Sequence, residues 1–421
     1  MQTTLADFIR DTAQGQEAEA ILRSCVHCGF CNATCPTYQL LGDELDGPRG
    51  RIYLMKQMLE GQPVTAVTRL HLDRCLTCRN CETTCPSGVQ YGRLIDIGRD
   101  VVERLSPRPA AERLLRAGLR KGLQSPVLFG SLLKLGQSVR SLLPSALREH
   151  LPAGIPTHSH SVQSDIQDSP DAREASATLT RRMLVLEGCV QPAMAPETNA
   201  AARRVLARLG IDLVAAPNAG CCGAIDQHLA APDAAKAAMR RNIDAWWPYI
   251  KQGCEAIVMT ASGCGSTVKE YGHHLRHDPA YAAKAARVSG LTRDLSEVLR
   301  DEDLSALKVF ALNPATPKRI AFHPPCSLQH GQQVRGVIEG ILTRAGFELL
   351  PVDESYLCCG SAGTYSVLQP ELSGQLRARK LSNLQARGPE LIASANIGCQ
   401  THLAAASDVP VVHWISLLDR G

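Results

Sequence analysis

CVHCGFCNATCP, residues 25–36, sets four cysteines at the spacing C-x2-C-x2-C-x3-C and places a proline after the last one. A second stretch, CLTCRNCETTCP at residues 75–86, repeats the spacing. In bacterial two-cluster ferredoxins this spacing supplies the ligands of [4Fe–4S] clusters. Structural zinc sites instead use two pairs of ligands. The two runs therefore predict two iron–sulfur clusters within one compact, mainly helical domain.

The fourth cysteine of each run is expected to bind the cluster of the other run, as it does in two-cluster ferredoxins. The first cluster then takes three cysteines of the first run and the last of the second: Cys25, Cys28, Cys31 and Cys85. The second cluster takes the complementary set: Cys75, Cys78, Cys81 and Cys35. This crossed assignment places the clusters close enough for electrons to pass between them.

The composition of the whole chain indicates an intracellular metal-binding protein. Its 421 residues include 17 cysteines, most of them in closely spaced sets that suit a metal better than a disulfide framework. The N-terminus lacks the apolar segment of a secretory signal and no long apolar run occurs, so we expect a cytoplasmic chain that does not span a membrane. Aromatic residues make up 4% and the net charge is +4, which argues against a nucleic-acid partner.

The chain divides into five predicted segments. Residues 1–105 hold the two-cluster ferredoxin-like domain, and residues 151–180, rich in Pro, Ser and Asp, form a flexible linker. Residues 106–150 form a basic amphipathic helical segment, with eight Lys or Arg against two Glu. This segment has two interpretations: a surface for a membrane or a partner, or helices packed on the cluster domain. The remaining segments, 181–315 and 316–421, are two α/β units.

The two α/β units follow from an internal repeat. Short apolar strands alternate with helices after residue 181, a pattern typical of βαβ units around a parallel sheet. A lone cysteine, a Cys-Cys-Gly (CCG) triplet and a last cysteine recur at offsets of 137, 137 and 135 residues: Cys189, Cys221, Cys222 and Cys264 match Cys326, Cys358, Cys359 and Cys399. The predicted fold class is α+β multidomain, with a helical two-cluster domain before a duplicated α/β CCG region with parallel sheets.

The cysteines of each CCG unit follow strands, and such loops gather at the carboxyl edge of a parallel sheet. Four thiols are therefore expected to converge in each unit. A further iron–sulfur cluster, a zinc ion, a redox-active thiol pair and purely structural cysteines all stay open as interpretations. Among the nearby histidines, His323 is the best candidate for moving protons because it ends a strand, while the others are His273, His274 and His402. A structural histidine held by hydrogen bonds is the other interpretation, and the more common one.

The sequence also lacks some cofactor motifs. Neither a dinucleotide-binding glycine motif after a strand nor a P-loop occurs. We therefore expect no flavin or nicotinamide site and no catalytic residue on this chain, which would carry electrons rather than perform hydride chemistry.

The order of these parts resembles the family of glycolate oxidase iron–sulfur subunits. Stretches that carry the resemblance are CVHCGFCNATCPTY (25–38), CLTCRNCETTCPSGVQYG (75–92), NAGCCGA (218–224) and LCCGSAGTYS (357–366). Lactate-utilisation iron–sulfur proteins, the third subunit of anaerobic glycerol-3-phosphate dehydrogenase and heterodisulfide reductase subunits share the arrangement more loosely. The resemblance covers nearly the whole chain and is weakest over 151–180.

The resemblance implies an electron-transfer subunit of an oxidoreductase complex. A flavoprotein partner would hold FAD and oxidise glycolate to glyoxylate, and D-lactate as well. This chain would pass the electrons through its two [4Fe–4S] clusters to a membrane acceptor, quinone. The complex would lie on the cytoplasmic side, peripheral to the inner membrane.

One departure from the wider group concerns the last cysteine of each CCG unit. Heterodisulfide reductase relatives end each unit in CxxC and bind non-cubane clusters there. In this chain Ala261 and Asn396 hold the partner positions, so Cys264 and Cys399 stand alone. This argues against a non-cubane cluster. The alternative function is still chemistry at the CCG cysteines, in a heterodisulfide-reductase-like subunit or in the iron–sulfur subunit of a lactate or glycerol-3-phosphate dehydrogenase.

Overall fold

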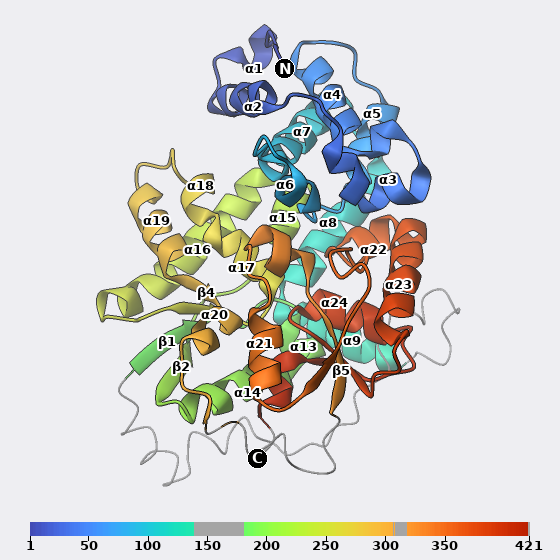
Figure 1. Ribbon diagram of the computed structural model, residues 1–421. Helices are drawn as coiled ribbons and strands as arrows, with labels where there is room; N and C mark the ends of the chain where they lie inside the picture. The colour runs from blue at the N-terminus through green and yellow to red at the C-terminus, as the bar shows by residue number, and fades with distance from the viewer. Residues whose placement is uncertain (139–180, 306, 308–317, 420–421) are drawn as a thin grey trace.

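A helical part that holds the N-terminus is stacked on two α/β units, which lie below it in Figure 1. The structure is a computed structural model, and it describes residues 1–138, 181–305, 307 and 318–419. The predicted linker at 151–180 and the end of the predicted basic segment, 139–150, lie outside the described residues.

The helical part is built from short helices separated by the cysteine runs. Proline begins α3 and α4, a position where its missing N–H is not needed. Apolar side chains from four helices share one core: Leu22, Met55, Leu72 and Leu94. The elements are α1 (Asp7–Arg10), α2 (Ala13–Ser24), η1 (Phe30–Thr34), α3 (Pro36–Leu41), η2 (Glu44–Asp46), α4 (Pro48–Leu59), α5 (Ala66–Asp73), α6 (Asn80–Thr84) and α7 (Tyr91–Leu105).

Helices α8 (Ala110–Gln124) and α9 (Pro126–Ser138) lead from the helical part along the side of the α/β units (Figure 1). Charge fixes α8 in place, because Arg120 pairs with Asp226 at 2.5 Å and Arg116 pairs with Asp73 at 3.3 Å. No residue of α8 is buried, and apolar side chains of both helices stay exposed: Leu114, Val127, Leu132 and Leu135. Within the described residues, no helix combines the length and apolar character needed to cross a bilayer.

Each α/β unit contains one parallel four-stranded sheet. The first sheet has the order β2-β1-β3-β4, from β1 (Arg181–Val185), β2 (Ile211–Ala215), β3 (Ile257–Met259) and β4 (Thr292–Asp294). The second has the order β6-β5-β7-β8, from β5 (Arg319–His323), β6 (Glu348–Leu350), β7 (Leu391–Ser394) and β8 (Val411–His413). Since the two orders are equivalent, the same topology occurs twice.

Helices cover the sheets of both units, and the units share a core. Val185 and Val258 of the first sheet lie in one hydrophobic cluster with Ile320 and Phe322 of the second, so the units are fused. The first unit contains α13 (Gln191–Met194), α14 (Pro196–Ala207), α15 (Ala224–His228), α16 (Pro232–Lys251), α17 (Ser262–Lys269), α18 (Tyr271–His274), α19 (Ala282–Leu291) and α20 (Leu295–Arg300). The second contains η5 (Ser327–Gly331), α21 (Val337–Arg344), α22 (Tyr365–Leu368), α23 (Pro370–Gln385), α24 (Ile397–Ala404) and η6 (Trp414–Leu417).

Ion pairs fix the helical part against the first unit. The Glu17 carboxylate of α2 lies 3.0 Å from His273 and 2.7 Å from Arg276. Burial raises the pKa of Glu17, but the hydrogen bonds and charges of these two partners outweigh burial and lower it to about 2. The carboxylate is therefore ionised at neutral pH. The predicted fold class, a helical two-cluster part followed by a duplicated parallel α/β region, is confirmed.

Candidate metal centres

The two cysteine runs adopt the same backbone turns. Left-handed conformations occur at His27 (φ 60°) and Gly29 (φ 88°) of the first run, and at Thr77 (φ 53°) and Arg79 (φ 61°) of the second. These positions are equivalent, since they lie two and four residues after the first cysteine of each run. A non-glycine residue in this conformation costs about 1–3 kcal/mol and persists where its surroundings demand it. Here the left-handed turns are needed because they direct the thiols of one run toward a common point.

Ferredoxin centre 1 consists of Cys25, Cys28, Cys31 and Cys85. Burial raises the pKa of Cys31 to about 11, and repulsion from the other three thiols of the centre acts in the same direction. Four thiolates at such close range need a compensating positive charge, which a metal centre supplies. Cys28 is exposed, whereas Cys25 is buried, so the centre reaches the surface on one side.

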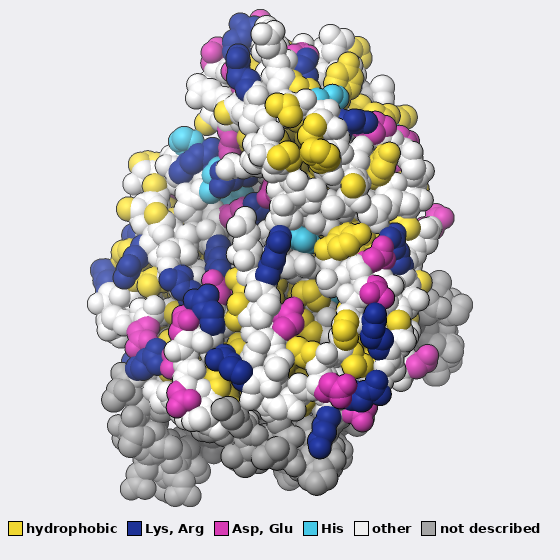
Figure 2. Space-filling model, in the orientation of Figure 1, with side chains coloured by type: hydrophobic (Ala, Val, Ile, Leu, Met, Phe, Trp, Pro, Cys, Tyr) yellow, Lys and Arg dark blue, Asp and Glu magenta, His cyan; other side chains and the backbone are white. Residues whose placement is uncertain are grey.

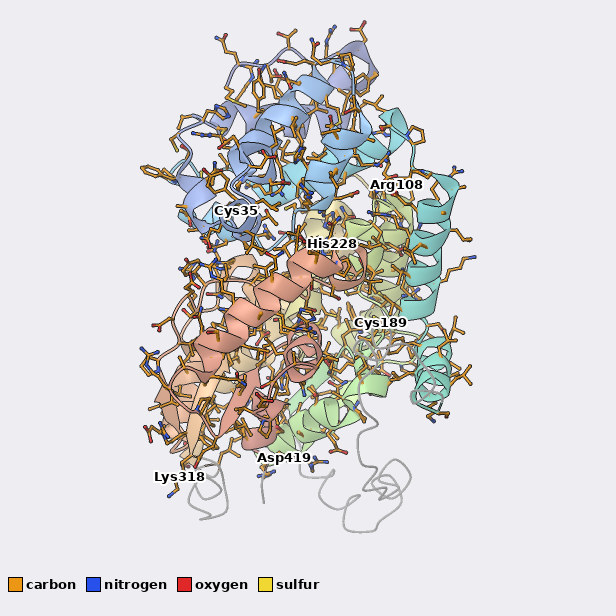
Figure 3. All side chains as sticks on the ribbon, turned by 90° about the vertical axis from the view of Figure 1, so that its right-hand side faces the viewer. Cys35, Arg108, Cys189, His228, Lys318 and Asp419 are labelled. Carbon is orange, nitrogen blue, oxygen red and sulfur yellow. The ribbon has the colours of Figure 1, made fainter. Side chains whose placement is uncertain are left out.

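Ferredoxin centre 2 consists of Cys35, Cys75, Cys78 and Cys81. Burial raises the pKa of Cys81, and the charges of Cys78, Cys75 and Cys35 raise it further. Three donors point at its sulfur atoms: Thr77 N to Cys75 Sγ at 3.4 Å, Tyr91 OH to Cys75 Sγ at 3.7 Å, and Arg51 Nη1 to Cys35 Sγ at 3.9 Å. Figure 3 shows Cys35 where the helical part meets the α/β units. Hydrogen bonds to sulfur of this kind tune iron–sulfur clusters.

A buried carboxylate orients the cation behind centre 2. Asp46 is fully buried and contacts Arg51 Nη2 at 3.4 Å, His71 Nδ1 at 3.0 Å and Arg74 Nη1 at 2.7 Å. Arg51 also donates to the His71 carbonyl at 2.7 Å. Asp46 therefore holds the Arg51 guanidinium against Cys35, where its charge offsets that of the thiolates.

Two short helices carry thiols of both ferredoxin centres. Cys31 and Cys35 lie in and directly after η1, and Cys81 and Cys85 lie in and directly after α6. Hydrogen bonds join these helices, since Asn80 Nδ2 donates to the Thr34 carbonyl at 3.1 Å. The fourth cysteine of each run thus comes beside the thiols of the other run. The crossed ligand assignment stays a prediction, which this arrangement supports, and both sets fit a cluster bound by four thiolates.

CCG centre 1 gathers the four thiols that follow the strands of the first unit: Cys189, Cys221, Cys222 and Cys264. The Cys221 thiol accepts hydrogen bonds from the Cys189 and Cys222 thiols, which lowers the pKa of Cys221. Cys222 also hydrogen-bonds Cys264, so all four thiols of the unit are linked in one chain of contacts.

Two polar side chains hold the CCG loop of the first unit in place. Asn242 Nδ2 donates to the Cys221 carbonyl at 3.0 Å, and Tyr271 OH donates to the Cys222 carbonyl at 2.8 Å. Both side chains are buried, so these bonds also satisfy groups that would otherwise be costly to bury. Neither residue was singled out from the sequence, because the contacts join segments more than twenty residues apart.

CCG centre 2 repeats this chain of thiol contacts with Cys326, Cys358, Cys359 and Cys399. The Sγ atoms of Cys326 and Cys358 lie 3.8 Å apart, Cys358 hydrogen-bonds Cys359, and Cys359 hydrogen-bonds Cys399. Gly360 N donates to Cys358 Sγ at 3.4 Å. The cysteines that correspond between the two units in the repeat thus form the same chain of contacts in each unit. The metal or cluster that each CCG centre binds is not identified by these contacts.

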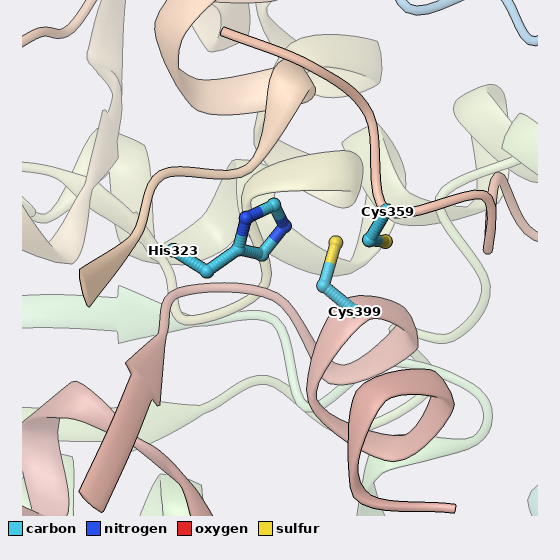
Figure 4. A group of neighbouring side chains, drawn as sticks. All are labelled: His323, Cys359 and Cys399. Atoms are coloured by element: carbon cyan, nitrogen blue, oxygen red, sulfur yellow. The ribbon is translucent and has the colours of Figure 1, made fainter. Parts of the chain in front are cut away.

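Of the four histidines considered from the sequence, His323 is the one placed with a pair of thiols among the described residues. Its ring lies near Cys359 and Cys399 (Figure 4). His273 pairs with Glu17, His274 lies 4.0 Å from Glu270, and His402 hydrogen-bonds Ser373 at 3.2 Å.

The centres lie beside one another across the domain boundary. Cys78 of ferredoxin centre 2 packs at the same cluster as Cys326 and Cys358 of CCG centre 2. Burial raises the pKa of Cys78, and the charge of Cys326 raises it further. The charge of Cys78 also acts to raise the pKa of Cys358, although the hydrogen bonds with Cys326 and Cys359 and burial have larger effects. Leu76 packs in the same cluster as Cys358. The sequence had no signal for this contact, because it joins residues about 250 to 280 positions apart in separate domains.

Asn396 connects the two CCG centres. Its Oδ1 accepts a hydrogen bond from Gly263 N, next to Cys264, at 3.1 Å. Its Nδ2 donates to Cys399 Sγ at 3.6 Å. Asn396 therefore spans the boundary between the units.

Two protein families match this chain. The family described as "4Fe-4S dicluster domain" matches residues 21–89, and the one described as "Cysteine-rich domain" matches residues 183–269 and 320–404. The first match covers both ferredoxin centres, and the second covers each CCG centre in turn.

Full-length relatives carry the same parts. The chain is 54% identical over 420 residues to the glycolate oxidase iron–sulfur subunit of Escherichia coli (strain K12), covering 100% of this chain and 99% of the relative. It is 30% identical over 400 residues to the probable glycolate oxidase iron–sulfur subunit of Bacillus subtilis (strain 168), covering 90% and 88%. Lactate utilization protein A of Bacillus licheniformis is 27% identical over 199 residues, covering 46% and 79%. The resemblance stated from the sequence is confirmed.

We expect Arg51→Gln to damage ferredoxin centre 2 selectively. The change removes the cation that offsets Asp46 and the Cys35 thiolate, and breaking a buried ion pair costs about 3–5 kcal/mol. Urea unfolding and iron content of the anaerobically purified chain measure the loss. Arg49→Gln is the matched control, because Arg49 lies on the same helix and forms a partly exposed pair with Glu44. Equal effects of the two changes would contradict the role given to Arg51.

Proposed function

Because this chain belongs to the family of glycolate oxidase iron–sulfur subunits, we propose that it relays electrons from a flavoprotein partner to a membrane acceptor. The partner, which holds FAD, oxidises glycolate to glyoxylate, and also D-lactate. Each substrate molecule gives up two electrons, which the chain passes to quinone. Two [4Fe–4S] clusters, one in each ferredoxin centre, supply the one-electron carriers.

The sharing of η1 and α6 by both ferredoxin centres carries this proposal. Each helix, with the residue directly after it, contributes one thiol to each centre, so the two centres have η1 and α6 as a common wall. Electrons can cross such a wall without any movement of the chain. A set of structural zinc sites would have no need of this proximity.

The side chains around the centres set up the relay. Arg51 and Tyr91 direct a positive charge and a hydroxyl at the sulfur atoms of centre 2, which lowers the cost of adding an electron there. Burial keeps water away from this centre, whereas exposed Cys28 gives centre 1 contact with the surface. Electrons therefore cross the protein boundary most directly at centre 1.

The surface around centre 1 is suited to a protein partner. Val26 and Phe30, on either side of Cys28, are 69% and 64% exposed, and Tyr53 lies nearby on α4 with 44% exposed. Figure 2 shows hydrophobic side chains gathered on the face of the helical part. Apolar groups exposed together are characteristic of interaction sites. We assign this surface, named here the entry surface (Val26, Phe30 and Tyr53), to the flavoprotein.

Helices α8 and α9 provide the membrane contact in this proposal. Their exposed apolar side chains include Leu114, Val127 and Leu132, and the exposed cations Arg113 and Lys121 lie on α8. Apolar and basic side chains on one helical segment favour binding to an anionic lipid surface. The complex would thus lie peripherally on the inner membrane, in reach of quinone.

The CCG cysteines complete the proposal. In each unit four thiols converge, which suits a further iron–sulfur cluster or a zinc ion. The contact between Cys78 and CCG centre 2 would extend the row of centres into the α/β region.

The proposed function is tested on the native complex, purified without oxygen. We expect glycolate to bleach the iron–sulfur absorbance, because its electrons reach the clusters through the flavoprotein. Bleaching by lactate or glycerol-3-phosphate, with no response to glycolate, would assign the chain to another substrate. A complex that responds to none of the three would refute the relay and direct attention to the CCG thiols.

Cys81→Ser and Cys85→Ser form a matched pair that tests the crossed ligation. Both residues lie at α6, four positions apart, but they belong to different centres. We expect Cys85→Ser to change the electron paramagnetic resonance (EPR) signal of the cluster held mainly by residues 25–31. Cys81→Ser should change the signal of the other cluster. The same signal lost in both variants would show that the ligands do not cross.

Phe30→Glu should weaken docking of the flavoprotein. A charge placed in the entry surface must be desolvated on binding, so we expect electron transfer from the partner to fall at least about tenfold, a loss of about 1.4 kcal/mol. The EPR signals of dithionite-reduced clusters should be unchanged. Val127→Glu, an exposed apolar position on α9, is the control for a general effect of added charge. Rates equal to the unmodified chain would rule out the entry surface.

A double change, Val127→Glu with Leu132→Glu, should release the complex from membranes. The added carboxylates oppose insertion and are repelled by anionic lipid. Flotation with vesicles that contain anionic lipid measures the bound fraction. A complex with Val67→Glu and Leu70→Glu, two exposed apolar positions on α5, serves as the control. If the double variant still floats with the vesicles, α9 is not the membrane contact.

A further inference from the structure

His323 is a buried polar side chain that lies beside a cysteine centre. Its exposed fraction is 0%, and neither ring nitrogen has a hydrogen-bond partner among the described residues. Leaving a buried polar group unsatisfied costs about 1–3 kcal/mol. An imidazole at the carboxyl end of β5 with two unsatisfied nitrogens therefore indicates a partner that is not part of the protein chain.

Two thiols are placed to share that partner with His323. A ring nitrogen of His323 and the Sγ atoms of Cys359 and Cys399 all lie within 4.8 Å of one another. Cys359 and Cys399 are 1% and 4% exposed, so the group is closed to solvent. Figure 4 shows the ring of His323, from β5, turned toward Cys399 of α24, with Cys359 of the CCG loop beside them.

The equivalent place in the first unit has no such donor. At the repeat offset of 137, the counterpart of His323 is Leu186, which is buried and apolar. A second difference accompanies the first. Ten residues after the proline that begins α23 stands Lys380, whereas ten residues after the proline that begins α16 stands Asn242. Within the described parts of the two units, only the second pairs its thiols with an imidazole and a buried cation.

We propose that His323 is a metal ligand which, with Cys359 and Cys399, binds a thiophilic divalent ion, zinc or ferrous iron. The inference rests on the proposed function only in taking CCG centre 2 to hold a metal. Imidazole and thiolate together suit zinc and iron. Thiolate and neutral imidazole are the ligating forms, so binding releases the two thiol protons to solvent.

The charges around the site balance for such an ion. A divalent cation with two thiolates is neutral. A tetrahedral ion has one more position, and Cys358 is the next donor in the chain of thiol contacts. With Cys358 as a third thiolate ligand, the ion and its ligands would carry a net charge of −1. Lys380 is fully buried, its Nζ donates to the Glu354 carbonyl at 2.6 Å, and its charge acts on all three of these cysteines. It supplies the compensating positive charge.

The direct test uses the native full-length chain, purified without oxygen and without added metal. Zinc and iron are counted per chain. If zinc is bound, X-ray absorption at the zinc edge should show sulfur together with imidazole nitrogen. If iron is bound, pulsed EPR should show a nitrogen coupling that changes when histidine is labelled with ¹⁵N. A first shell of sulfur alone would overturn the ligand role of His323.

Variants supply the second arm. His323→Leu, which copies Leu186 of the first unit, should weaken binding of this metal at least about tenfold. His323→Cys should retain the metal with an all-sulfur shell, which distinguishes a lost ligand from a damaged core. His413→Gln is the control, because His413 is also buried in the second unit but has partners for both ring nitrogens, Thr260 O and Ile415 N. Full metal content in His323→Leu, with an unchanged spectrum, would also contradict the proposal.

The results of these experiments distinguish a failure of the His323 proposal from a failure of the proposed electron relay. Bleaching of the ferredoxin clusters by glycolate depends on centres 1 and 2, and it is unaffected if His323 proves not to be a ligand. A native chain with no metal beyond the two ferredoxin clusters would refute both the occupancy of CCG centre 2 and the role of His323, and it would leave the relay intact.

Discussion

The need to neutralise buried thiolates shapes the first hundred residues of this protein. Two groups of four thiols are enclosed by short helices, and burial together with mutual repulsion opposes the ionised form that metals bind. Helices as short as η1 and α6 have little stability of their own. Metal binding to the thiols is therefore expected to be coupled to folding of this part, because a bound metal links the short helices that carry the thiols.

Buried and partly buried ion pairs position the side chains around these thiols and the domain that carries them. Asp46 is buried so that it can hold Arg51 against Cys35, and a buried aspartate would be costly without its three partners. At the boundary with the α/β units, Glu17 is kept ionised by His273 and Arg276. The helical part is thereby held in the orientation that brings Cys78 beside Cys326 and Cys358.

The duplicated units show how one topology can support two different centres. Both sheets have the same strand order, and both deliver four thiols from the same loops. The differences lie in single side chains: His323 in place of Leu186, and Lys380 in place of Asn242. Asn396 links the two centres through its hydrogen bonds to Gly263 N and Cys399 Sγ.

Sequence patterns predicted the fold class and the family because their signals are local. Cysteine spacing and alternating strands and helices can be recognised within a few residues, and the repeat offset showed which residues correspond between units. His323 was noted at a strand end, and comparison with Leu186 would have marked it further. Arg51 and Lys380 were missed, since an arginine or lysine within a helix is usually exposed, and only packing shows that these two are buried.

The contact of Cys78 with CCG centre 2 was beyond prediction for a related reason, because it depends on how separate domains meet. The exposed apolar side chains of α8 and α9 show that a face predicted as amphipathic need not be covered by the chain itself.

We propose that the two clusters, which have η1 and α6 as a common wall, exchange electrons across it. EPR spectra of the fully reduced, anaerobically purified chain test it most directly. We expect at least about eight cluster iron atoms, and two [4Fe–4S] signals from the ferredoxin centres that are broadened and split by interaction between neighbouring spins. Two sharp, independent signals, or iron for a single cluster, would contradict it.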